Sequence, residues 1–357
     1  MCCWIGLLLL TACGGCEEPG KKPLPDANPD IAANVNNINN ANNANHGTPT
    51  EIAIVELPLS GDAAGALAEY SALAWFGDTL ILVPQYPSRF DHRLVALEKS
   101  QILAYLDGAP ASALAWRTVP FDDGGLRSLV SGFEGFEALG FSGSSVYMTV
   151  ETGTSAGAGC FVVRGSVSTE PQLSITLDPQ SLRAIALPVQ LENMCHEALL
   201  VLEDRVVTFY EANGVHVNPD PGVQVFDPQL APLAVQPMAQ LEYRLTDVTP
   251  VDAAGRFWAV NYFYTGEADL LDPAPDPLAA MFGEGPTHAA SEAVERLVEL
   301  VWTPAGVTHS GAAPIPLRLE ADARNWEGLA RLDDRGFLIV TDKFPTSILA
   351  FVPFPGK

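Results

Sequence analysis

The stretch FEALGFSGSSVYMTV, residues 136–150, decides the fold, because the rest of the chain repeats its plan. A short run of small and apolar residues leads into a Ser-Gly turn and then into an apolar strand, as in a β-hairpin. Four further segments have the same plan, with Gly, Asp or Glu at the turn. They begin at Tyr70, His196, Leu245 and Trp326. A long-period repeat of this kind predicts a solenoid, a propeller or another array of similar units.

The intervals between these segments predict an all-β fold, a five-bladed β-propeller with four-stranded blades. Each interval holds about four short strands with their turns, and long segments of helical periodicity are nearly absent. The last repeat has only one further apolar run, SILAFVPF at 347–354, before the chain ends. We therefore expect EIAIVELPL, residues 51–59, to join that blade, so that the N- and C-terminal strands pair and close the ring. An insertion in the fourth repeat, residues 267–286, is expected to form a surface loop or a lid.

The first sixteen residues, MCCWIGLLLLTACGGC, have the features of an export signal. The apolar run from Trp4 to Leu10 is too short to cross a bilayer and is typical of a signal-peptide core. The sequence Leu10-Thr11-Ala12-Cys13 resembles the bacterial lipobox, which implies that residues 1–12 are removed and that Cys13 is lipidated. An ordinary signal peptide cut elsewhere is the alternative, and no Lys or Arg precedes the apolar run.

Residues 13–50 predict a lipidated, disordered linker, because they are rich in Asn, Ala and Pro and have almost nothing to bury. Residues 51–357 are numerous enough for the propeller domain. Gly14, after the anchor cysteine, resembles the sorting signal of outer-membrane lipoproteins. We expect a protein of the bacterial cell envelope, anchored by its N-terminal lipid at the outer rather than the inner membrane, with its domain in the periplasm or at the cell surface.

The chain carries a formal net charge of -24 at pH 7. Such an acidic surface repels nucleic acid and anionic lipid, so no nucleic-acid partner is expected. The surface can recruit metal cations, or it can simply keep a secreted monomer soluble.

Five side chains occupy the second position of the five repeats. The first strand of each propeller blade lines the central channel, so equivalent positions form a ring. They are Ser71, Glu137, Glu197, Thr246 and Glu327. Converging carboxylates repel one another, and Ca²⁺, with its flexible shell of oxygen ligands, suits this ring better than Zn²⁺, which prefers His or Cys. The alternatives are that the glutamates face solvent or stay protonated, and that Asp247 replaces Thr246.

The order Tyr-Ser, Glu, His-Glu, Thr-Asp and Trp-Glu-Gly over residues 70–328 resembles the channel-lining signature of calcium-activated nucleotidases of the apyrase family. It is also similar to exported phytase-like propellers, whose repeats read Glu-Gly before an apolar strand. The nucleotidase resemblance implies a five-bladed propeller with calcium in its tunnel, held by the five ring residues. The chain departs from it at PQYPSR, residues 84–89, where the nucleotidases have an acidic-basic turn that meets phosphate.

The second strand of each blade runs back to the face where the ring opens, so its end lies at the rim. Candidate catalytic residues there are Glu151 and Glu211, which could activate water, and Arg89 and Lys343, which could hold departing charge beside calcium. These roles describe a calcium-dependent hydrolase of phosphate or other esters. Because no catalytic constellation is complete, the molecular activity of the predicted calcium-binding propeller stays unassigned, and this hydrolase is the alternative function. The four residues could instead be solvated loop-end residues, and a non-catalytic propeller could bind a small molecule or a protein.

Two cysteines remain in the domain, Cys160 and Cys195. An exported protein meets conditions that permit disulfides, so the pair could bridge the second and third blades. Two buried free thiols are the alternative.

Overall fold

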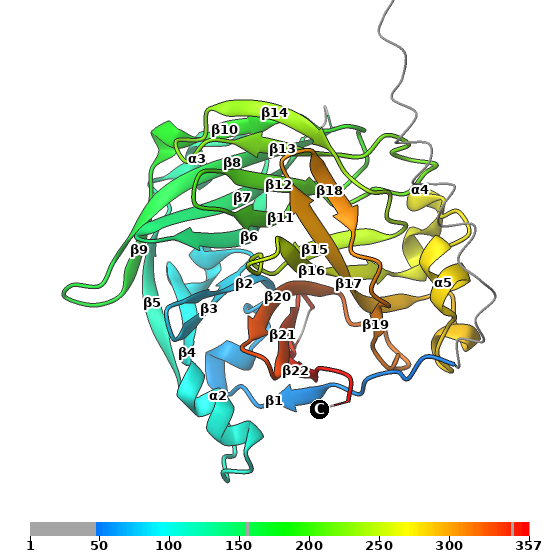
Figure 1. Cartoon of the computed structure of the whole chain (residues 1–357). Coiled ribbons are helices and arrows are strands. Elements are labelled where there is room, and N and C mark those ends of the chain that lie inside the picture. The colour runs from blue at the N-terminus through cyan, green and yellow to red at the C-terminus, as the bar shows by residue number, and fades with distance from the viewer. Residues whose placement is uncertain (1–47, 155–156, 344–345, 357) are drawn as a thin grey trace, which may run out of the picture. The chain divides into compact units, whose positions relative to one another are not determined.

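The computed structural model describes residues 48–154, 157–343 and 346–356, which form mainly β-strands (Figure 1). The predicted signal peptide, Cys13 and nearly all of the predicted linker lie outside these residues. Within the described ranges, no helix has both the length and the apolar character that a membrane crossing requires.

The strands form antiparallel units of four neighbours, which we call meanders. The first meander consists of β2 (Tyr70–Phe76), β3 (Thr79–Pro84), β4 (Arg93–Glu98) and β5 (Trp116–Asp122). The second consists of β6 (Phe133–Ser142), β7 (Ser145–Thr154), β8 (Gly157–Ser168) and β9 (Ser174–Leu177). Their outer strands β5 and β9 pair in parallel, so the two meanders share one sheet, in which β10 (Arg183–Ile185) also pairs with β8.

The third and fourth meanders form separate sheets. The third consists of β11 (His196–Val201), β12 (Val206–Tyr210), β13 (Gly222–Phe226) and β14 (Pro232–Pro237). The fourth consists of β15 (Arg244–Val248), β16 (Arg256–Phe263), β17 (Val294–Thr303) and β18 (Gly306–His309), with β19 (Ile315–Pro316) paired to β17.

The last meander contains both ends of the described chain. Its order is β1 (Val55–Leu57), β22 (Leu349–Pro353), β21 (Gly336–Thr341) and β20 (Trp326–Leu332). β1 pairs antiparallel with β22, Val55 opposite Phe351, which confirms the predicted pairing of the terminal strands. The N-terminal strand is shorter than the predicted residues 51–59, although Ile52 forms a further bridge with Leu317.

The first strands of the five meanders contact one another in a closed order, β2, β6, β11, β15, β20 and back to β2. Apolar side chains fill the spaces between neighbouring sheets: the ring of Phe209 in the third meander, for example, lies 5.7 Å from that of Phe257 in the fourth. The second strands are covered on both faces, and β12 (VVTFY) is buried at every position, whereas the outer strand β14 is mostly exposed. This closed order of packed sheets supports a propeller fold.

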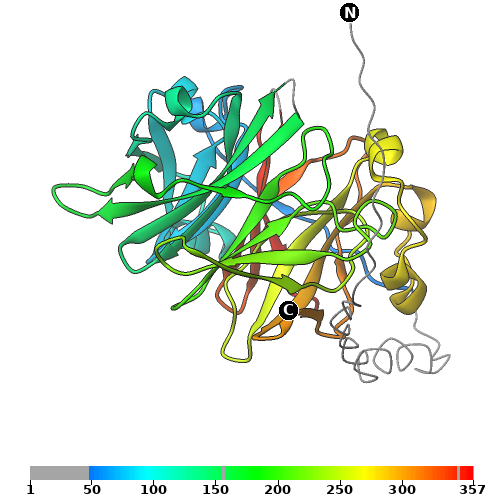
Figure 2. The ribbon, with the colours of Figure 1, turned by 90° about the horizontal axis from the view of Figure 1, so that it is seen from above.

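Short helices lie in the connections. They are α2 (Lys99–Leu106), α3 (Leu126–Leu129), α4 (Ala268–Leu271) and α5 (Pro277–Phe282). The last two belong to the predicted insertion, residues 267–286, and lie together at one side of the sheets (Figure 2). That insertion is not a free surface loop: Leu271 and Leu278 are buried, and Asp276 forms an ion pair of 2.5 Å with Arg296 of β17.

Candidate functional site

The first strand of each of the five meanders, which we call its inner strand, has a register shift. The shift lies at or next to the second position of the sequence repeat. The shifts fall between Tyr70 and Ala72, Phe136 and Ala138, His196 and Ala198, Leu245 and Val248, and Trp326 and Gly328. A β-bulge inserts an extra residue and redirects its side chain. The predicted ring residues are therefore structurally equivalent, although the fourth shift contains both Thr246 and Asp247.

A cavity of about 600 Å³ opens where the first strands begin and the second strands end. Its lining includes three of the five predicted ring residues, Glu137, Glu197 and Glu327. The further charged side chains that line it are Glu151, Glu267, Asp322, Asp342, Arg244 and Lys343. Carboxylates therefore outnumber basic groups in the lining by seven to two.

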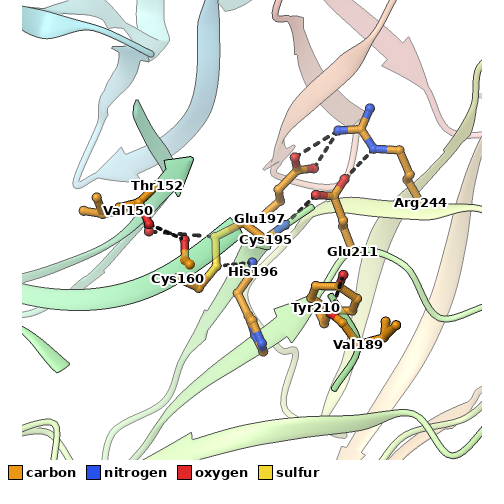
Figure 3. The surroundings of a disulfide bond; sticks show 11 residues. Val150, Thr152, Cys160, Val189, Cys195, His196, Glu197, Tyr210, Glu211 and Arg244 are labelled. Carbon is orange, nitrogen blue, oxygen red and sulfur yellow. Dashed lines mark hydrogen bonds and ion pairs between the residues drawn. A yellow bond between two sulfur atoms is a disulfide. The ribbon is translucent and has the colours of Figure 1, made fainter. Parts of the chain in front are cut away.

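Arg244, the first residue of β15, lies among four carboxylates, two of which Figure 3 shows. Its Nη2 donates to both oxygens of Glu197, at 2.9 and 3.1 Å, and its Nε donates to Glu211 at 2.5 Å. Its remaining contacts are 3.3 Å to Glu267 and 3.5 Å to Glu327. The side chain is only 6% exposed, so these charge-assisted bonds form largely away from water. We call Arg244, Glu197, Glu211 and Glu327 the Arg244 half of the cluster.

Sequence reasoning missed Arg244. It stands two residues before Thr246 in the segment YRLTDV, outside the six-residue alignment that defined the repeat. The available signal was a basic residue at the start of a strand that is otherwise buried at every position. A buried guanidinium is unfavourable without anionic partners, so its partners could have been sought among the aligned glutamates.

Glu137, Glu151 and Asp342 form the other part of the cluster, which we call the Glu137 half. Glu137 and Glu151 are each 3% exposed, and Oε1 of each has no hydrogen-bond partner among the described residues. Burial raises the pKa of Glu137 well above its usual value, and the charges of Glu151 and Asp342 raise it further. Burial and the charge of Glu211 raise the pKa of Glu151 to about 8, and burial raises the pKa of Asp342 to about 6.

Ser71 and Thr246 make a different contact from the ring glutamates. Ser71 Oγ donates to the carbonyl of Phe136, and Thr246 Oγ1 donates to the carbonyl of Trp326 at 2.6 Å. Each acceptor lies on the next inner strand, one residue before its bulge glutamate. The hydroxyls therefore link neighbouring inner strands, and within the described chain neither residue lines the cavity.

Asp247, the alternative to Thr246, is also turned away from the cavity lining. Its carboxylate accepts from the backbone N–H groups of Val248 at 2.8 Å and Leu329 at 2.7 Å. It thus stabilises the bulge in β15 and links that strand to β20.

The cavity has the donor chemistry of a calcium site but not the predicted shell. Its lining offers carboxylate and amide oxygens, with no Cys or His from the described ranges, which suits Ca²⁺ better than Zn²⁺. In the same ranges, no group of three or more Asp, Glu, His or Cys is close enough together to hold a metal ion. Glu197 and Glu327 contact Arg244 instead. Calcium would bind here only if the carboxylates of the Glu137 half approached one another.

The four predicted rim residues are dispersed. Glu151 and Lys343 line the cavity, whereas Glu211 is fully buried behind it. Arg89 lies outside the lining, 3.8 Å above the ring of Tyr86. Lys343 Nζ donates to the carbonyl of Ala323 at 2.6 Å.

Cys160 and Cys195 form a disulfide with a Cα separation of 5.6 Å, next to the cluster (Figure 3). Cys160 lies opposite Glu151 in the pairing of β7 with β8, and the Cys195 N–H donates to Glu211 at 2.8 Å. The disulfide therefore connects β8, the neighbour of the strand that carries Glu151, to the residue just before β11, which carries Glu197. His196, the next residue, points away from Glu197, and burial lowers its pKa to about 3.

No protein family model matches the chain, and no curated protein is similar to it in sequence. Among solved structures, a glucose dehydrogenase is 11% identical, covers 85% of this chain and 99% of its own, and has a TM-score of 0.45. The GH43 endo-arabinanase from Bacillus licheniformis is 8% identical over 83% and 96%, with a TM-score of 0.43. The GH43_1 enzyme from Xanthomonas citri, complexed with xylose, is 12% identical over 84% and 90%, with a TM-score of 0.46. Similarity at this level assigns neither an activity nor a ligand to this chain.

Proposed function

We propose that the protein is an exported, lipid-anchored five-bladed propeller with four-stranded blades that binds calcium in its cavity. Five meanders with equivalent bulges, whose first strands contact one another in a closed order, support five blades. The pairing of β1 with β22 supports closure within the last blade.

The calcium proposal rests on the unpartnered, buried Oε1 atoms of Glu137 and Glu151, which line the cavity together with Asp342. Three neighbouring carboxylates repel one another when ionised, and a divalent cation removes that repulsion. Glu137, Glu151 and Asp342 would approach one another to hold the ion, which would supply positive charge in the cavity. Ca²⁺ fits better than Mg²⁺ because it tolerates irregular geometry.

The anchor proposal rests on the lipobox-like sequence that ends at Cys13. Lipidation there would hold the chain at the bacterial envelope, at the outer membrane, with the domain in the periplasm or at the cell surface. We expect a Cys13→Ser variant to stay in the aqueous phase of a detergent partition, whereas the parent enters the detergent phase. Equal partitioning of the two would exclude the anchor.

The phosphoester hydrolase alternative has little support in the site. A phosphate group needs cationic partners, yet Arg244 contacts carboxylates and Lys343 donates to a carbonyl. Arg89 lies outside the cavity lining. The molecular activity therefore stays unassigned, and the excess of carboxylates disfavours an anionic substrate.

A thermal titration tests the calcium proposal. The protein is freed of metal with a chelator and melted with increasing CaCl₂ or MgCl₂. A ligand that binds only the folded state at a hundredfold excess over its Kd stabilises by about 2.7 kcal/mol, so calcium should raise Tm by several degrees and magnesium by less. If millimolar calcium leaves the Tm of the metal-free protein unchanged, the protein does not contain this site.

A further inference from the structure

Arg244 shows what kind of cation this cluster can accept. Its guanidinium is flat and several ångströms wide, and its three nitrogens reach Glu197, Glu211, Glu267 and Glu327 at once, with Nη2 shared between Glu197 and Glu327. These carboxylates are spaced for a broad cation with several directed donors rather than for a single metal ion. The Arg244 side chain therefore binds the carboxylates of its half of the cluster as a cationic ligand would.

The Glu137 half has the same chemistry but lacks such a partner. Glu137 and Glu151 are almost fully buried, line the cavity and each keep an oxygen without a hydrogen bond from the described residues. Unsatisfied buried carboxylate oxygens are rare in folded proteins and are unfavourable, so they mark a position where a donor is expected. Among the described residues, no group of acidic side chains here is compact enough for a metal ion.

The cavity is large enough for an organic ligand. Its volume of about 600 Å³ falls within the usual range for small-molecule sites, which is roughly 300–1,000 Å³. Tyr264, in the connection after β16, lines it and is 48% exposed. An exposed aromatic ring beside carboxylates favours a cation through cation–π attraction. A neutral ligand would leave the surplus of negative charge unbalanced.

We propose that the cavity binds a small organic cation that carries a guanidinium or primary ammonium group, with Glu137 and Glu151 as its acceptors and Tyr264 at its entrance. In the Glu137 half, the cationic group donates hydrogen bonds to carboxylates, as the Arg244 guanidinium does to Glu197 and Glu211 in the other half. The proposal concerns the same cavity as the calcium proposal but needs no metal.

Agmatine is a suitable probe, because it has a guanidinium at one end and an ammonium at the other. The full chain, freed of metal with a chelator, is titrated calorimetrically with agmatine and with 1,4-butanediol, a neutral molecule with a chain of the same four carbons. We expect saturable binding of one agmatine per chain and no detectable heat from the diol. Absence of agmatine binding, or equal binding of the diol, would overturn the proposal.

Two variants locate the site. Glu151→Gln keeps the size of the side chain and should weaken agmatine binding at least tenfold, since it removes a buried charged acceptor. Glu203→Gln removes the same charge from an exposed turn and should leave binding unchanged. Tyr264→Ala, at the exposed entrance, should weaken binding severalfold without disturbing the buried strands. If Glu151→Gln and Glu203→Gln behave alike, the bound cation lies elsewhere and the proposal fails.

Competition separates this proposal from the calcium proposal. If agmatine binds and calcium displaces it, both ligands use the Glu137 half and both proposals stand. Binding of agmatine by a protein that ignores calcium would leave this proposal standing and remove the other. If the protein binds calcium but not agmatine, the calcium proposal stands and this proposal fails.

Discussion

The two halves of the carboxylate cluster differ in how their charge is balanced. Glu197 and Glu211 bond to Arg244 at 2.5 to 3.1 Å, whereas Glu137 and Glu151 each keep a buried oxygen without a partner in the described part of the chain. A buried carboxylate is unfavourable unless a cation or a proton neutralises it. The chain therefore supplies one cation to the Arg244 half, in which burial still raises the pKa of Glu197 and Glu327. It supplies none to the Glu137 half, whose charge is left to protons or to an external cation.

Removal of the internal cation should have the largest effect. Arg244→Met leaves several buried carboxylates uncompensated, so we expect the free energy of unfolding, measured with urea, to fall by about 3–5 kcal/mol. Arg256→Met is the control, because Arg256 pairs with Asp252 on the surface and is 52% exposed. Surface pairs contribute little, so this control should change stability by less than about 1 kcal/mol. Equal losses in the two variants would contradict the role given to Arg244.

Loss of the link between the halves should come next. The double variant Cys160→Ser, Cys195→Ser removes a bridge across 35 residues, which restricts the unfolded chain, so unfolding should become easier by about 3 kcal/mol. A reducing agent added to the parent protein should reproduce the loss, and it should not affect the double variant. A parent protein that is indifferent to reduction would show that the disulfide contributes no stability.

The Glu137 half should give the metal-free protein an unusual dependence on pH. The folded state holds protons on Glu151, with a pKa of about 8, and on Asp342, with a pKa of about 6, that the unfolded chain releases at lower pH. Folded pKa values above the unfolded ones mean that the contribution of these two groups to stability is greatest at low pH and is lost as pH rises toward 8. A tenfold difference in proton affinity between the folded and unfolded states corresponds to about 1.4 kcal/mol, and we expect stability to fall by at least this amount between pH 5 and about pH 9.

Urea unfolding in chelator at several pH values measures this slope. Glu151→Gln should flatten it and should be more stable than the parent at about pH 9, since it cannot ionise. Glu203→Gln should retain the parent slope. Stability that rises with pH in the parent would contradict this prediction, because it would mean that the folded state binds fewer protons than the unfolded chain.

The inter-strand hydroxyls should have the smallest effect. Ser71→Ala and Thr246→Val each remove one hydrogen bond to a neighbouring strand, so each should lower the free energy of unfolding by about 1 kcal/mol. Both variants should retain the calcium response of the parent, because the hydroxyls bond to carbonyls outside the cavity lining. Loss of the calcium response in either variant would mean that the replaced residue is a calcium ligand, as the sequence predicted.

Much of the fold could be predicted from local pattern. Each repeat has its own turn and apolar strand, so the hairpin at residues 136–150 and the pairing of β1 with β22 follow from short-range signals and from the missing last strand. The equivalence of the ring positions was also predictable, because the aligned position of every repeat coincides with the bulge of its first strand.

The chemistry of the site was less predictable, because it depends on side chains that meet from different sheets. Ser71 and Thr246 occupy the expected positions, yet a short hydroxyl side chain reaches a neighbouring carbonyl before it reaches the cavity. Arg244 lay outside the aligned segment, and only the spatial arrangement shows that it contacts glutamates of two other meanders. An equivalent position in a repeat does not fix the direction of its side chain.

Direct measurement of calcium binding tests the central claim, that the Glu137 half binds calcium. Metal-free protein is titrated with CaCl₂ in a calorimeter, alongside the variants Glu137→Gln, Glu151→Gln and Glu203→Gln. The account predicts one calcium per chain for the parent and for Glu203→Gln, and at least tenfold weaker binding for the other two variants. Binding that survives in both Glu137→Gln and Glu151→Gln, or that is absent from the parent, would contradict it.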